Sequence, residues 1–102
     1  MSTLSARSEA VLNEFAHRPG VTPDQAANLR TILNGSPVLV DQFNTAVQHG
    51  DLRHVAALTN PTVGGQYHPD TRTMDLPLSL LTPPLTGEKI GEVTFVLGHE
   101  LK

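Results

Sequence analysis

Residues 63–78 read VGGQYHPDTRTMDLPL, and this stretch distinguishes the chain from an all-helical protein. Its two ends, Val63–Tyr67 and Thr73–Leu78, are expected to form short strands. Between them, His68–Arg72 has the residue types of a turn, so the stretch predicts a β-hairpin. One face of the second strand is apolar, because apolar and polar residues alternate along it. The apolar members of that face are Met74, Leu76 and Leu78. Pro77 favours an edge or the end of a strand, because proline cannot donate a ladder hydrogen bond.

The first 60 residues carry helix signals instead. In the first segment, five residues recur at three-to-four spacing and so share one helix face. They are Leu4, Ser8, Val11, Leu12 and Phe15. This helix is expected to end before Pro19. The second helix has a clear start, since Thr22 can cap it, Pro23 suits its first position and Gln25 completes a capping box. Ala26, Leu29 and Leu33 share a face of this helix, and Gly35 is expected to end it.

Ser36-Pro37 repeats the cap-plus-proline start for a third helix. This helix carries an apolar stripe of Leu39, Phe43 and Val47. Gly50 is a natural C-cap for it. Asp51 is then expected to cap a fourth, short helix that carries Leu52, Val55 and Leu58.

The closing segment, from Thr86 onward, is ambiguous by periodicity alone. A helix places Ile90, Val93, Leu97 and Leu101 on one face, whereas a strand places Val93, Phe95 and Leu97 together. With a helix here, the fold is α+β: three to four N-terminal helices, a β-hairpin and an apolar C-terminal helix. The expected division is a helical part, residues 1–60, and a hairpin-plus-helix part, residues 61–102.

Composition excludes several classes of protein. The net charge is −3 with no basic block, so no nucleic-acid partner is expected. No run approaches the roughly 18 apolar residues of a membrane span, and the N-terminus lacks the apolar region of a classical signal peptide. We therefore expect a soluble protein, and its compartment stays open. Without cysteine, disulfides and thiolate zinc sites are impossible.

The chain ends on Gly98-His99-Glu100-Leu101-Lys102 after an apolar run. In the motif H-E-x-x-H, two histidines four residues apart share one helix face and hold zinc, and the glutamate between them is the general base. His99 is thus the candidate first zinc ligand and Glu100 the candidate catalytic base. The second histidine would fall one residue past Lys102. The alternative without a catalytic role is that His99 and Glu100 form a solvated pair on a polar face.

In the order hairpin, loop and apolar helix ending in Gly-His-Glu-Leu, the chain resembles the zincin metallopeptidases. The resemblance covers about Val63 to Lys102, 40 of the 102 positions. It implies a helical closing segment, zinc as cofactor and hydrolysis of peptide bonds in a peptide or protein substrate. It also implies that the hairpin edge pairs with extended substrate, so that replacing Gly65 is expected to impair binding more than folding. The third ligand in this family lies further downstream.

The expected function is therefore that of an N-terminal fragment of a zinc metallopeptidase, inactive as the isolated chain. The alternative is a small non-catalytic helical interaction module. Tyr67 is expected to be a half-buried strand residue. His68 and Asp70 are expected to be turn residues. The remaining histidines are expected to cap helices or lie on the surface near helix ends, and they are His17, His49 and His54.

Overall fold

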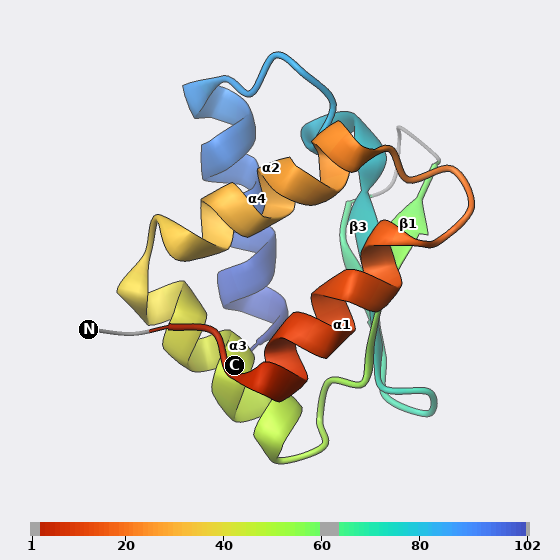
Figure 1. Ribbon diagram of the computed structural model, residues 1–102, viewed down its shortest axis with the longest axis vertical. Helices are drawn as coiled ribbons and strands as arrows, with labels where there is room; N and C mark the ends of the chain where they lie inside the picture. The colour runs from red at the N-terminus through yellow and green to blue at the C-terminus, as the bar shows by residue number, and fades with distance from the viewer. Residues whose placement is uncertain (1–2, 60–63, 102) are drawn as a thin grey trace.

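A computed structural model of the chain describes residues 3–59 and 64–101. Four α-helices and one small sheet make up the described part, which confirms the α+β class (Figure 1). The helices are α1 (Ala6–Ala16), α2 (Pro23–Asn34), α3 (Pro37–Gln48) and α4 (Gly87–Glu100). The strands are β1 (His54–Leu58), β2 (Gln66–His68) and β3 (Thr73–Pro77), and the short 3-10 helix η1 (Leu78–Leu80) follows β3.

Helices α2 and α3 begin where the sequence predicts. The hydroxyl of Thr22 accepts from the backbone N–H of Gln25, and the Gln25 side chain accepts from the N–H of Thr22, which closes the predicted capping box. Ser5 and Ser36 cap α1 and α3 in the same way, through their hydroxyls. Four residues of the predicted inward face of the first helix are buried in α1, namely Ser8, Val11, Leu12 and Phe15. The fifth, Leu4, precedes the helix and is half-buried against the core.

The predicted fourth helix after Asp51 is wrong, because the chain forms strand β1 there. Val55 is fully buried and lies opposite Met74 in the parallel pairing of β1 with β3. The N–H of Arg53 already donates to the carbonyl of Arg72 at 2.8 Å, just ahead of the strand. A Leu-x-x-Val-x-x-Leu spacing suits one face of a short helix. Here the main-chain pairing offered by β3, a partner some 20 residues away, outweighs that local preference.

The sheet has the order β1-β3-β2, with β1 parallel to β3 and β2 antiparallel to it. The predicted hairpin is therefore present as β2 and β3, although Val63 lies outside the described residues. Only β2 is an edge strand of the hairpin, because β1 covers the other side of β3. Pro77 is the last residue of the central strand, at a position where a missing N–H is tolerated.

One hydrophobic core joins all these elements. Its largest buried side chains come from both predicted parts of the chain and include Phe15, Leu33, Phe43, Met74 and Leu97. Helix α1 packs against β1, and α2, α3 and α4 pack against one another beside it (Figure 1).

The closing segment is helical, as the resemblance implies. Val93 and Leu97 of α4 are buried, and Leu101 is half-buried against the core. Ile90 and Phe95 are the exceptions to an inward-facing apolar set, since they are 39% and 74% exposed.

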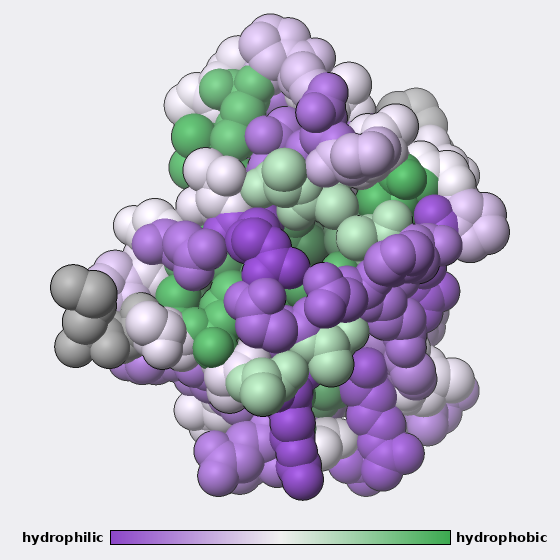
Figure 2. Space-filling model, in the orientation of Figure 1, coloured by the Kyte–Doolittle hydropathy of each residue, from purple (hydrophilic) through white to green (hydrophobic). Residues whose placement is uncertain are grey.

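On the face drawn in Figure 2, hydrophilic residues cover most of the surface, with smaller apolar areas between them. None of the described helices combines the length and the apolarity needed to cross a membrane.

Candidate functional site

His99 and Glu100 form the last two residues of α4. The helix starts at Thr86, whose hydroxyl accepts from the N–H of Lys89, and it ends at Leu101, whose N–H donates to the carbonyl of Leu97. The His99 side chain is exposed. Its ring stacks on that of Phe95, one turn earlier, with centroids 6.2 Å apart and an angle of 6° between the planes.

Glu100 points elsewhere. It is partly buried and lines a cavity of about 490 Å³, where the C-terminal ends of α3 and α4 meet. The other residues of this cavity, which we call the α3–α4 cavity, are Thr45, Ala46, His49, Asp51, Leu52, Tyr67 and Leu101. His99 lines a separate, shallower hollow with Thr94, Phe95 and Gly98. The two adjacent motif residues thus face different surroundings.

A zinc site needs more ligands than this arrangement brings together. Within residues 3–59 and 64–101, no three His, Asp or Glu side chains lie close enough to hold a metal ion. A catalytic zinc site uses about three protein ligands and leaves one position open for water. His99 offers one imidazole, so the described residues do not constitute a zinc site by themselves.

Tyr67 belongs to strand β2 of the hairpin, and it lines the α3–α4 cavity. It is half-buried in β2, as predicted, and its hydroxyl donates to the backbone carbonyl of Asp51. That bond ties the edge strand to the loop after α3. Tyr67 of the edge strand and the carboxylate of Glu100 therefore line the same cavity.

The hairpin also touches α4 directly, at Gly65. A Cβ built on Gly65 would lie 2.2 Å from Cγ1 of Val96, so only glycine fits at this position without movement. Gly64 next to it has open space around it. The expectation that Gly65 replacements would affect binding more than folding conflicts with this contact, because any side chain there collides with α4.

The remaining histidines have structural partners. His17 is the C-cap residue of α1, and its Nδ1 lies 2.7 Å from the carbonyl of Asn13; His49 is the C-cap residue of α3. Both agree with the prediction. His54 does not, because it opens strand β1 and its Nδ1 lies 2.8 Å from Oε1 of Glu14.

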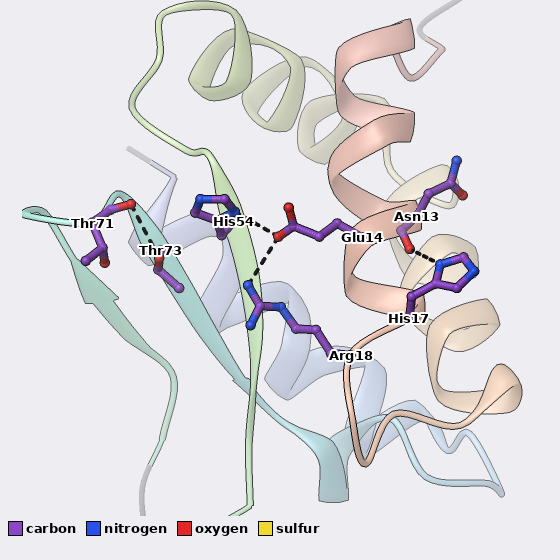
Figure 3. A network of polar contacts seen from close by, with 7 residues as sticks. All are labelled: Asn13, Glu14, His17, Arg18, His54, Thr71 and Thr73. Atoms are coloured by element: carbon purple, nitrogen blue, oxygen red, sulfur yellow. Dashed lines mark hydrogen bonds and ion pairs between the residues drawn. The ribbon is translucent and has the colours of Figure 1, made fainter.

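Glu14 accepts from two cations or potential cations, as Figure 3 shows. Besides His54 from β1, Nη2 of Arg18 donates to the same oxygen at 3.2 Å. The His54 hydrogen bond, with a smaller contribution from Arg18, holds the pKa of Glu14 below its ordinary value, although partial burial opposes the shift. This network fastens α1 to the sheet on an exposed side, and we assign it a structural role.

His68 and Asp75 form a cross-strand pair that the sequence analysis missed. Nε2 of His68 lies 2.8 Å from Oδ2 of Asp75, and His68 is the last residue of β2 rather than a turn residue. Asp70 lies in the turn, as predicted. The register of the hairpin brings the pair together, since Gln66 lies opposite Asp75 and His68 opposite Thr73. That register depends on turn geometry that residue types alone did not specify.

Comparison with known proteins adds no relative: no protein family, no curated protein and no solved structure matches this chain.

Proposed function

We propose that this chain is the N-terminal part of a zinc-dependent metallopeptidase, with His99 as one zinc ligand and Glu100 as the general base. The observation that supports the proposal best is the α3–α4 cavity. Glu100 reaches it from the end of α4, and Tyr67 reaches it from an edge strand. A peptidase needs this combination, because an extended peptide pairs with a strand edge while a carboxylate takes a proton from the attacking water.

The proposal requires ligands from outside the described residues, since His99 is one where about three are needed. Zinc, when bound, would lower the pKa of its water and so supply the nucleophile. The described residues of this chain would have two roles. Glu100 would accept the proton of the attacking water, and for this the ring of His99 would have to leave Phe95 and turn toward the side of α4 on which Glu100 lies. The edge strand β2 would orient an extended substrate.

The test uses the natural protein carried through the sequence that follows Lys102. Zinc content is measured after dialysis, and cleavage is measured on casein and on a mixed peptide library. Glu100→Gln keeps the shape of the side chain but accepts no proton, so turnover should fall by about 10²–10⁴-fold while zinc is retained. His99→Ala should lose the zinc. His17→Ala is the matched control, because that imidazole bonds within α1 and should leave both readouts unchanged.

Two results would refute the proposal. One is a Glu100→Gln rate within a few-fold of the parent, and the other is full zinc content in His99→Ala. The 102-residue chain alone is expected to bind zinc poorly and to cleave nothing. A tight one-to-one zinc complex of that chain would place the site among residues other than those proposed. If the natural protein neither binds zinc nor cleaves peptides, the alternative of a non-catalytic interaction module replaces the peptidase.

A further inference from the structure

A groove of about 440 Å³ runs along the outward side of α4, away from the α3–α4 cavity. Its apolar wall is formed by Phe95 and Val96 of α4 and by Leu80 of η1. Phe95 is 74% exposed, and the stacked ring of His99 leaves most of it in water. An aromatic side chain exposed to this degree beside an apolar groove is a feature of binding surfaces.

Gly91 opens this groove at the expense of helix stability. It lies in the interior of α4, where glycine destabilises a helix relative to alanine. A Cβ at this position would meet no atom within 4 Å, so the packing of the described residues does not require glycine. What the missing side chain provides is depth in the groove, which allows another chain to approach the helix backbone.

Two carboxylates border the groove one helical turn apart, Glu88 and Glu92. In the part of the chain that the structure describes, neither forms an ion pair. Lys89, which lies between them in sequence, donates instead to the carbonyls of Thr82 and Pro84. Glu88 stabilises the N-terminus of α4 through the helix dipole, but this effect falls off within the first turn and does not account for Glu92.

From these observations we propose that the α4 groove binds a peptide segment of a partner protein that carries an aliphatic or aromatic anchor next to a lysine or arginine. The anchor packs on Phe95 and Val96 above Gly91. The cation pairs with Glu92 and Glu88. The α4 of a second copy would fit less well, because the lysine that the structure describes in this helix, Lys89, is already held by two carbonyls of its own loop.

The test is selection of random peptides displayed on phage against the immobilised protein, followed by anisotropy titration of the selected peptides. EDTA is present throughout, so that zinc binding and peptidase activity play no part. We expect the enriched peptides to combine an apolar anchor with Lys or Arg. Their affinity should fall as salt rises, since the carboxylates are exposed.

Matched variants locate the site. Phe95→Ser should weaken binding by at least about tenfold, and Glu92→Gln by a few-fold. Gly91→Gln fills the groove and should also weaken binding, while its melting temperature stays at or above that of the parent. Val38→Ser is the control, because Val38 is 65% exposed on α3, away from the groove.

Failure to enrich any peptide, or enrichment of acidic ones, would overturn the proposal. So would peptide affinity that survives both Phe95→Ser and Gly91→Gln. Light scattering tests whether a second copy of the chain occupies the groove. Self-association that is lost in these two variants would assign the groove to a second copy instead.

Discussion

Replacing Gly65 by alanine tests how the hairpin sits against α4. The added Cβ would lie 2.2 Å from Cγ1 of Val96, more than an ångström inside the ordinary contact range of 3.4–4 Å. It would also lie 3.3 Å from the carbonyl oxygen of Asp75. Val96 cannot yield easily, because a β-branched side chain in a helix strongly prefers one rotamer. Either the Val96 rotamer or the backbone just before β2 must move, and overpacking of this kind costs about 1–3 kcal/mol.

A loss of stability of this size is measurable in a domain of about 100 residues. At about 2 kcal/mol, and about 4–8 °C per kcal/mol, the melting temperature of Gly65→Ala should fall by about 10 °C. Gly64→Ala is the matched control, because nothing lies within 4 Å of its Cβ. The double variant Gly65→Ala/Val96→Ala removes the colliding methyl groups. Its loss of stability should be smaller than the sum of the two single losses, by about 1–2 kcal/mol.

Thermal and urea unfolding of the parent and of the four variants (Gly65→Ala, Gly64→Ala, Val96→Ala and the double variant), followed by circular dichroism, supply these numbers. Equal stability of Gly65→Ala and Gly64→Ala would contradict the packing of the hairpin on α4. Strict additivity in the double variant would do the same. In either case the support that the α3–α4 cavity gives to the proposed function would weaken, because the same hairpin carries Tyr67 to the cavity.

Two further predictions concern the N-terminal helices. Because the pKa of Glu14 is lowered in the folded state, its contribution to stability is present above its unfolded pKa and is lost as pH falls through the folded one. Unfolding free energies measured from about pH 6 to pH 3 should therefore decline less steeply in His54→Gln than in the parent, and equal slopes would rule out the Glu14–His54 pair as the cause. Thr22→Ala removes a cap and half of the capping box of α2, so it should cost about 1 kcal/mol in urea unfolding. Thr59→Ala, at an exposed threonine outside any helix, is its control, and an equal loss there would show that the cap is not responsible.

The features that the sequence predicted correctly are those determined by neighbouring residues. A cap such as Thr22 with Gln25 satisfies N–H groups only three residues away, so its residues identify the helix start without knowledge of the rest of the fold. The inward face of α1 follows from the 3.6-residue period of a helix in the same local manner. The burial of Met74 and Leu76 follows from the two-residue period of a strand.

Only the tertiary structure decided the features that depend on distant partners. Whether Val55 lies in a helix or a strand depends on β3, about 20 residues later, which offers main-chain hydrogen bonds that a local pattern cannot anticipate. The same holds for the candidate site. His99 and Glu100 are neighbours in sequence, yet Glu100 borders the α3–α4 cavity because α3 packs against α4 and Tyr67 of β2 lines the same cavity, while His99 stacks on Phe95 outside it. Sequence determines which chemical groups a helix carries, but the packing of other elements around that helix determines which of those groups share a cavity.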